Sequence, residues 1–486
     1  MLRHNVCTRL WKERLLQLIQ IGVLGFLCLN TLFYGIHAFY SITFPYQIDY
    51  GEGFLLHQAV QLSEGLSIYQ PISDYPLTVA NYGPVYPLVW SGFIKLFGVS
   101  FFWGRLISVL STIGICSLIY LSVRQSASKS VSIAAAMLFL VSPYIYEWSH
   151  LSRVDMLGIF LSVAGLTWVY HNETGRRIYW SIPLFVLAIF TKVTFVAAPL
   201  AACLYLGLKD RKVVIWFSAL LGGSVAVILV GLNVLADGQF LLHTIRYNQN
   251  QFLLNRMIAG LVAFGAGHGI FLGLAMVAFA LKSVRKEAAL LLFYGLMAAL
   301  MSFTYGKVGS SVNYYLEILV FLSLAVGLVF RQAWDKSNHK PWHLLTSLCL
   351  LVQLMAYFHV PFYYRNRTGF PVYQQIGNIS KMIQSVAQPI LSEDAGILVL
   401  NDKQIWFQPF IMCQLSKQGI WNQGPFVRDI QANKYGLILL NANIAIDPID
   451  AIRSDRFTLQ MIQAIRNSYR LSYNSRDYYL YIPKDL

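Results

Sequence analysis

The chain has 486 residues, of which 56% are hydrophobic and 12% are charged, and its mean hydropathy is +0.53. Soluble domains carry about 25% charged residues, so this composition excludes an ordinary soluble protein and indicates a polytopic membrane protein. The formal net charge of +15 does not require a nucleic-acid partner, because the basic residues lie mainly in short connections between apolar segments and in a terminal region. Topology and anionic lipid explain that excess. We expect membrane lipid, and no nucleic acid, among the partners.

The N-terminal segment combines a basic start with a long apolar run. Arg3, Arg9, Lys12 and Arg14 precede residues 15–48, which contain no Asp, Glu, Lys or Arg. A spanning helix needs about 20 apolar residues, and no A-x-A-like cleavage site interrupts the run. We interpret it as a retained first helix and not as a cleaved signal peptide.

Apolar segments continue to about residue 360. They predict eleven spans, at residues 15–44, 103–123, 131–146, 156–171, 178–191, 193–208, 213–235, 257–281, 288–304, 314–330 and 342–360. Residues 84–98 are apolar and aromatic but short and broken by proline, which favours an interfacial helix. The sequence therefore predicts an all-α polytopic bundle over residues 1–360, with a first outside loop at 45–102.

The basic residues are distributed unequally between the two sets of connections. One set, with the N-terminus, holds 17 basic residues and the other holds seven. The richer set includes the clusters Arg124/Lys129, Arg176/Arg177, Lys209/Arg211/Lys212, Lys282/Arg285/Lys286 and Arg331/Lys336/Lys340. The positive-inside rule then predicts a cytoplasmic N-terminus and an extracytoplasmic C-terminus.

Hydropathy falls after Pro361, and the pattern changes to short strands and amphipathic helices. Strands are predicted at 397–401, 437–440 and 478–482, and helices at 373–387, 405–418 and 457–467. These segments predict a small soluble α/β domain at residues 361–486, which is within the usual domain size.

Two carboxylates stand where the first helix should leave the bilayer. Asp49 and Glu52 are three residues apart, with Tyr50 between them. On a helix this spacing places both acids on one face, where like charges can raise one pKa and produce a base. Tyr50 supplies a ring that can stack on a sugar. We expect catalysis from the two acids.

A second polar cluster, residues 147–155, links two predicted spans. Arg153 and Asp155 lie in this turn, and they either form an ion pair that closes it or contact a substrate or a metal. Two carboxylates and a histidine in the cluster could gather a divalent cation, but the spacing is not diagnostic of one. The need for a metal stays open.

Further cations lie on the same predicted side as Asp49. They are Lys192, Arg246, Arg256 and Lys307, and the polar residues Asn313, Tyr314 and Glu317 follow at the start of the next span. Charged groups at membrane depth usually face a wet cavity or a partner. Positive charge held beside a base is suited to a reaction in which a phosphate leaves.

Several motifs occur in an order that resembles a known superfamily. They are Asp49-Tyr-Gly-Glu52-Gly, Ala59, Glu64 to Tyr69, Tyr82-Gly-Pro-Val-Tyr-Pro87, Lys95 to Gly98, Arg105-Leu106, Ser152 to Met156, Thr191-Lys192, and Gly309 to Tyr315 before Glu317. Over most of its length the chain resembles the GT-C glycosyltransferases, particularly bacterial relatives of the protein O-mannosyltransferases and the aminoarabinose transferases.

The resemblance implies an inverting hexosyl or pentosyl transfer from a polyprenyl-phosphate sugar to a hydroxyl of a glycan, lipid or protein. It implies a bacterial plasma (inner) membrane location with the site on the outer face. Counted back from Ala59, Glu52 falls at the Glu of the family's adjacent Asp-Glu pair and Gly51 at the Asp. Asp49 lies two residues before Gly51, and a bulge in the loop would restore its reach, so we expect Asp49 as the base, with Glu52 second. We also expect Tyr82 among the substrate contacts. A polysaccharide polymerase or ligase, and a small-molecule transporter, remain alternatives.

Overall fold

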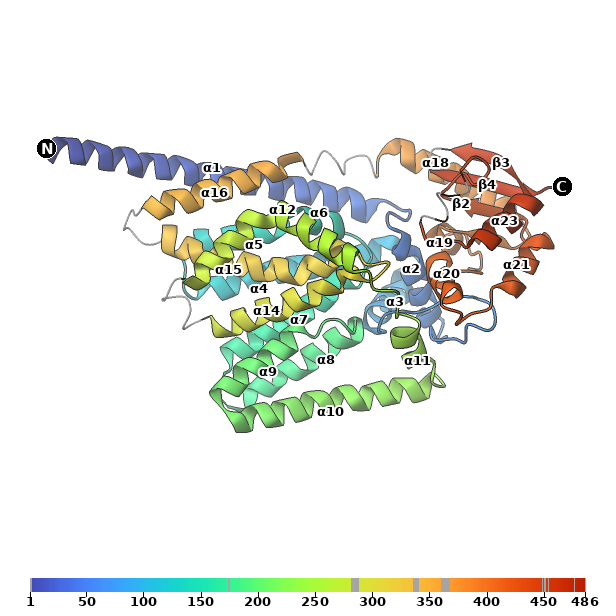
Figure 1. Ribbon diagram of the computed structural model, residues 1–486, viewed down its shortest axis with the longest axis horizontal. Helices are drawn as coiled ribbons and strands as arrows, with labels where there is room; N and C mark the ends of the chain where they lie inside the picture. The colour runs from blue at the N-terminus through green and yellow to red at the C-terminus, as the bar shows by residue number, and fades with distance from the viewer. Residues whose placement is uncertain are drawn as a thin grey trace.

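The computed structural model is an elongated helical bundle with a small α/β domain at one end (Figure 1). The N-terminus of α1 lies at the opposite end. The structure describes residues 2–173, 175–280, 288–334, 341–359, 368–447, 449, 452, 454–475 and 477–485. The expected domain boundary at 360–361 and the basic residues Lys282, Arg285, Lys286, Lys336 and Lys340 lie outside the described residues.

The bundle begins with α1 (Leu2–Thr43), followed by α2 (Tyr50–Ser63) and α3 (Val85–Phe97) in the first loop, residues 45–102. The later helices are α4 (Phe101–Arg124), α5 (Lys129–Leu140), α6 (Pro143–Trp148), α7 (Asp155–His171), η1 (Arg176–Trp180), α8 (Ser181–Thr191), α9 (Ala197–Lys209), α10 (Arg211–Leu235), α11 (Gln239–Leu241), η2 (Leu242–Arg246), α12 (Leu254–Ala280), α14 (Ala289–Ser302), η3 (Phe303–Gly306), η4 (Val312–Tyr315), α15 (Leu316–Trp334), α16 (Pro341–Ala356) and η5 (Tyr357–His359).

Six helices of the described part are long and apolar enough to cross a membrane. They contain Arg14–Thr43, Phe101–Arg124, Arg211–Leu235, Leu254–Ala280, Ala289–Gly306 and Val312–Trp334. Within the described residues, helices cover most of each of the eleven predicted spans. Several of these helices are too short to count by this criterion, so the number eleven is not confirmed. Pro143 divides the span predicted at 131–146 into α5 and α6, because proline is accommodated in the first turn of a helix but not in its interior.

Side-chain caps mark where several helices begin. Ser100 accepts a hydrogen bond from the backbone N–H of Phe102 at the start of α4, and Asp210 does the same for Lys212 at the start of α10. Such caps satisfy N–H groups that have no partner within the helix. The segment predicted to be interfacial forms α3, a separate helix of 13 residues.

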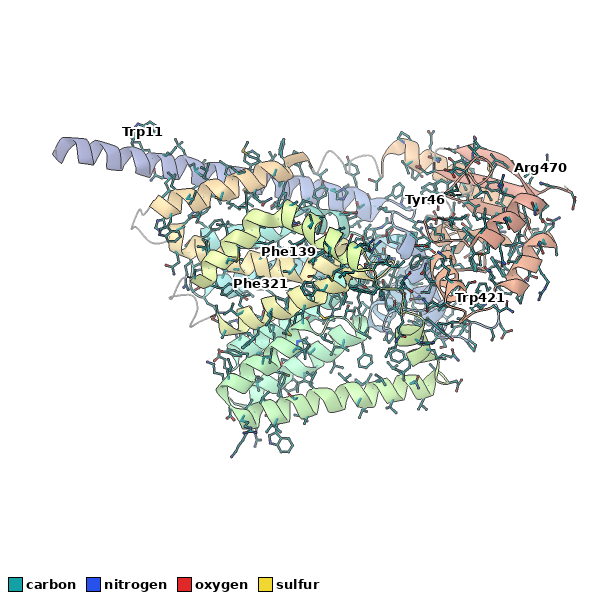
Figure 2. All side chains as sticks on the ribbon, in the orientation of Figure 1. Trp11, Tyr46, Phe139, Phe321, Trp421 and Arg470 are labelled. Carbon is teal, nitrogen blue, oxygen red and sulfur yellow. The ribbon has the colours of Figure 1, made fainter. Side chains whose placement is uncertain are left out.

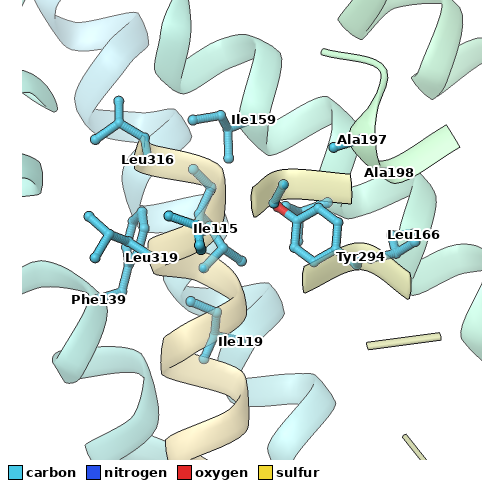
Figure 3. Close-up of a cluster of buried hydrophobic side chains, with 14 of the residues drawn as sticks. Ile115, Ile119, Phe139, Ile159, Leu166, Ala197, Ala198, Tyr294, Leu316 and Leu319 are labelled. Carbon is cyan, nitrogen blue, oxygen red and sulfur yellow. The ribbon is translucent and has the colours of Figure 1, made fainter. Parts of the chain in front are cut away.

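Helix α15 lies at the centre of the bundle and α10 at its edge (Figure 1). Figure 3 shows Ile115 of α4 beside Leu316 and Leu319 of α15, all buried. Close packing of this kind holds a helix in one position. Because η4 directly precedes α15 in the chain, this packing also fixes the position of the polar residues of η4.

The C-terminal domain contains a four-stranded sheet with the order β1-β2-β4-β3. Strand β1 (Ile390–Ser392) is parallel to β2 (Leu437–Leu440), while β4 (Tyr478–Pro483) is antiparallel to both β2 and β3 (Tyr469–Ser475). In register, Ile390 pairs with Leu437 and Ile438 pairs with Tyr481. The helices are α18 (Phe370–Ser385), α19 (Ala395–Val399), α20 (Pro409–Lys417), α21 (Gly424–Gln431) and α23 (Leu459–Ser468).

The strands predicted at 437–440 and 478–482 are confirmed, but the strand predicted at 397–401 is wrong. That segment begins within α19, and the strand β1 lies before it. Asp394 caps α19 by accepting a hydrogen bond from the Ile397 N–H at 3.0 Å. A short buried apolar run does not distinguish helix from strand by periodicity, and here the cap makes the difference.

The C-terminal domain is hydrogen-bonded directly to the first loop. The Gly396 N–H donates to Gln47 Oε1 at 3.0 Å. A short backbone pairing adds the Leu77 N–H to the Trp406 carbonyl at 3.0 Å and the Gln408 N–H to the Leu77 carbonyl at 2.9 Å. The domain therefore forms part of the walls of any site built by that loop.

Candidate active site

The two acids of the first loop form the start of α2. Asp49 Oδ1 accepts a hydrogen bond from the Gly51 N–H at 3.0 Å, and Glu52 Oε2 accepts one from the Asp49 N–H at 3.2 Å. This reciprocal arrangement is a capping box. It explains why α2 begins at Tyr50, directly after Asp49.

Glu52 is a buried link between three segments. Its carboxylate accepts hydrogen bonds from Arg105 Nε at 3.0 Å and Nη2 at 2.8 Å, and from the Ser152 N–H at 2.7 Å. Neither charged side chain is exposed to solvent. Burial raises the pKa of Glu52, but the positive charge and hydrogen bonds of Arg105 outweigh it, so the pKa lies below its ordinary value. This is the opposite of the increase expected from repulsion by Asp49.

Arg153 pairs with Asp49 and not with its sequence neighbour Asp155. Arg153 Nη1 lies 3.1 Å from Asp49 Oδ1, and Nη2 donates to Tyr82 Oη at 3.3 Å. The guanidinium lies against the first turn of α2, where a Cβ on Gly51 would be only 1.2 Å from Nη1. The glycine therefore creates the space for this ion pair.

Asp155 positions residues from three other segments. Its Oδ1 accepts hydrogen bonds from Lys192 Nζ at 2.8 Å and Asn313 Nδ2 at 3.0 Å. Its Oδ2 accepts one from Trp148 Nε1 at 2.8 Å. Lys192 Nζ also lies 4.5 Å from the centre of the Tyr314 ring, a cation–π geometry. The ammonium of Lys192 is thereby held in one place.

Lys307 differs from the other two cations because its ammonium is held by neutral groups. Its Nζ donates to the Asn248 carbonyl and to Asn248 Oδ1, both at 2.8 Å. Within the described part of the chain, no carboxylate lies within salt-bridge distance of this ammonium. Burial, together with the charge of Lys192, lowers the pKa of Lys307 to about 8.

These side chains surround a cavity of about 420 Å³, which we call the charged cavity. Seven of the residues predicted from sequence line it: Tyr50, Tyr82, Arg153, Lys192, Lys307, Asn313 and Tyr314. Neutral residues that were not among the predicted site residues complete the wall, among them Gln58, Asn81, Asn248, Asn250, Ser311, Gln408 and Phe410. The cavity therefore lies between the bundle, the first loop and the C-terminal domain.

The other predicted residues lie outside this wall. Glu52 and Asp155 lie behind it, as described above. Glu317 is buried in α15, where it accepts a hydrogen bond from Ser162 Oγ at 3.4 Å. Arg256 donates to the Ser310 carbonyl at 2.6 Å, and Arg246 is exposed on η2.

Asp49 lies at the rim of the charged cavity, with its side chain 28% exposed. Its neighbours Tyr50 and Gly51 and its partner Arg153 all line the wall. The Gly51 N–H and Arg153 both contact Oδ1. These two contacts lie on Oδ1, and the exposed part of the carboxylate can accept a hydrogen bond from a ligand.

The sequence did not decide whether the chain binds a metal ion. Among the residues that the structure describes, no group of three or more His, Cys, Asp or Glu side chains could hold a metal ion. The candidate cluster at 147–155 instead uses Asp155 to bind Lys192, Asn313 and Trp148.

Comparison with known proteins supports one interpretation of this architecture. Residues 81–236 match the family described as dolichyl-phosphate-mannose-protein mannosyltransferase. The crystal structure of ArnT from Cupriavidus metallidurans bound to undecaprenyl phosphate is similar over 94% of this chain and 98% of its own, with a TM-score of 0.62 and 13% identity. The chain has the GT-C fold.

A second GT-C neighbour is the oligosaccharyltransferase of Archaeoglobus fulgidus tethered with an acceptor peptide containing the NVT sequon. It is similar over 94% of this chain and 74% of its own, with a TM-score of 0.53 and 11% identity. No curated protein matches the chain in sequence. The fold and the family match together support a glycosyltransferase in a multi-pass membrane protein.

Proposed function

We propose that the chain transfers a sugar from a polyprenyl-phosphate donor to an acceptor hydroxyl on the outer face of the membrane, with inversion at the anomeric carbon. The observation that carries the proposal is the charged cavity, where Arg153, Lys192 and Lys307 converge and a partly exposed carboxylate lies at the rim. The similarity to ArnT, whose structure holds undecaprenyl phosphate, supports the choice of donor.

The three cations make the cavity suitable for an anion. Asp49 and Asp155 neutralise Arg153 and Lys192, whereas Lys307 keeps an uncompensated positive charge when protonated. A phosphate placed against Lys307 would replace the missing counter-ion. Positive charge fixed in advance stabilises a leaving phosphate without reorganisation at the moment of reaction.

Asp49 is the base in this proposal. Its Oδ2 takes the proton of the acceptor hydroxyl while that oxygen attacks the anomeric carbon. The bond between this carbon and the phosphate oxygen breaks, and the lipid phosphate leaves with the electron pair and is stabilised by Lys307. Arg153 orients Asp49 through Oδ1 and leaves Oδ2 available. Glu52 is less suited to the role, because Arg105 and backbone N–H groups already occupy its carboxylate.

The experiment that tests this function compares the cell envelope of the source organism with and without the chain by mass spectrometry. Cells without it should lack a sugar residue on one envelope component, and the wild-type gene should restore that residue. The Asp49→Asn variant should not restore it, since loss of a general base lowers the rate by about 10²–10⁴.

Asp74→Asn is the matched control, because Asp74 is an exposed acid of the same loop and its replacement should restore the sugar fully. Normal membrane abundance of Asp49→Asn must accompany the loss. An envelope that is identical with and without the chain, or full restoration by Asp49→Asn, would contradict the proposed reaction or the proposed base, respectively.

A further inference from the structure

A second cavity of about 400 Å³, the aromatic cavity, lies where the first loop, the segment after α10 and the C-terminal domain meet. Its polar lining residues and three of its aromatic ones are Ser73, Tyr75, Gln239, Tyr247, Trp421 and Asn422, and the rest of its wall is apolar. Figure 2 labels Trp421 on the C-terminal domain. The volume is within the range of about 300–1,000 Å³ that is typical of ligand sites.

The chemistry of this lining differs from that of the charged cavity. None of the residues that line it is Asp, Glu, Lys or Arg. Four rings, those of Tyr75, Tyr247, Trp421 and Phe426, stand beside the amides of Gln239 and Asn422. Rings offer apolar faces, and amides and hydroxyls both donate and accept hydrogen bonds. A neutral ligand with apolar faces and many hydroxyl groups fits this combination.

The rings are held in position before any ligand binds. Tyr75 Oη donates to Asp429 Oδ2 at 2.7 Å, and the ammonium of Lys434 lies 4.2 Å from the centre of the Tyr75 ring. The Trp421 ring lies against Phe407 and Phe426, with ring centres 6.1 Å apart in each case. Little side-chain freedom is then lost on binding, which favours affinity.

The two cavities are neighbours that share a partition. Leu77 lines the aromatic cavity and Gln408 lines the charged cavity, and the Gln408 N–H donates to the Leu77 carbonyl at 2.9 Å. Ile245 and Tyr247 likewise line the charged and the aromatic cavity, respectively. A molecule that is anchored in the aromatic cavity therefore lies next to the charged cavity.

The lining favours a saccharide over a peptide. The backbone of Leu77 is already paired with Trp406 and Gln408, so this segment offers no free edge to which an extended peptide could add as a strand. A lipid phosphate is also disfavoured because no cation lines the cavity.

We propose that the aromatic cavity binds a neutral saccharide portion of the acceptor, an inference that rests on the glycosyltransferase function proposed above. The acceptor is then a glycan or a glycosylated molecule, held by Trp421 and its neighbours while one of its hydroxyls reaches the charged cavity.

Binding of the full chain in detergent to arrayed neutral oligosaccharides, homo-oligomers of glucose, mannose, galactose and N-acetylglucosamine, tests this inference. Wild type should bind at least one series. Trp421→Ala should bind it at least about tenfold more weakly, and Trp421→Phe should recover most of the binding. Tyr373→Ala, which removes a 45% exposed ring of the same domain, is the matched control and should bind as wild type does.

Absence of binding to every series, or equal binding by Trp421→Ala, would overturn the inference. Binding of arrayed peptides that is lost in Trp421→Ala, without saccharide binding, would overturn it in favour of a peptide acceptor. Stabilisation of the wild-type chain by undecaprenyl phosphate is measured in parallel. If that stabilisation holds while saccharide binding fails, only the acceptor inference is lost.

Discussion

The charged cavity and the aromatic cavity are built by the same parts of the chain but have opposite chemistry. Both take residues from the first loop, the η2 region and the C-terminal domain, yet Arg153, Lys192 and Lys307 line only the first. The charged cavity also includes the start of α2 and the polar residues of η4, which directly precedes α15. This difference fits the proposal that the charged cavity binds the anionic leaving group and the aromatic cavity binds the neutral acceptor.

Loss of the buried pair between Glu52 and Arg105 should have the largest effect and should impair both cavities, because the pair joins α2, α4 and the turn at Ser152. Glu52→Ala leaves an unpaired buried cation, which costs about 3–5 kcal/mol of the free energy of unfolding. Denaturant unfolding in detergent measures this loss of stability.

The Glu52→Leu/Arg105→Leu double variant should recover part of the lost stability. Glu64→Ala, at an exposed site, is the control and should change the free energy of unfolding by less than about 0.5 kcal/mol. A fully stable Glu52→Ala protein would show that the pair is not a framework for the site.

A methyl group on Gly51 should damage the charged cavity alone. It would displace Arg153 from Asp49, since the Cβ would lie 1.2 Å from Nη1. Misplacement of about 1 Å can lower a rate by about 10²-fold, so we expect sugar transfer to fall about tenfold to a hundredfold in Gly51→Ala, with saccharide binding unchanged. Gly92→Ala on α3 has no atom within 4 Å of the new carbon and serves as the control. Unimpaired transfer by Gly51→Ala would mean that the Asp49–Arg153 geometry is not required.

A change of pH should have a smaller effect, and it should alter ligand affinity in the charged cavity but not in the aromatic cavity. Burial and Lys192 lower the pKa of Lys307 to about 8, so the ammonium is charged below that pH and loses its charge above it. Affinity for undecaprenyl phosphate, measured by titration between pH 7 and 9, should therefore fall several-fold as the pH rises. Lys307→Arg should flatten this dependence because arginine stays protonated. Saccharide binding should stay constant over the same interval, and an identical pH profile in wild type and Lys307→Arg would remove Lys307 from the phosphate site.

The sequence identified much of the charged cavity because charge is rare in an apolar bundle. Arg153, Lys192 and Lys307 each stand out as polar groups near membrane depth, where they need a partner or a wet cavity. The same reasoning did not reveal the partners. Arg153 pairs with Asp49, about a hundred positions earlier, and only the fold brings them together. Arg105 carried the same signal, a lone cation within an apolar segment, and could have been matched to Glu52.

The aromatic cavity and the helix α19 of the C-terminal domain were not predicted from the sequence, for other reasons. Tyr75, Tyr247 and Trp421 come from three distant segments, and single aromatic residues are common at membrane interfaces. Asn248 is neutral and carries no charge that would mark it within an apolar bundle. The helix α19 replaced a predicted strand because its cap at Asp394 was not weighed against its apolar run.

The most direct test of the central claim, that the charged cavity holds the phosphate of a lipid carrier, is the change in melting temperature of the purified chain with undecaprenyl phosphate. A ligand that binds the folded state raises its stability with concentration. We predict that undecaprenyl phosphate stabilises the wild-type chain, that undecaprenol without phosphate does not, and that Lys307→Ala loses most of the stabilisation. Equal stabilisation of Lys307→Ala and wild type, or of wild type by undecaprenol, would contradict the account.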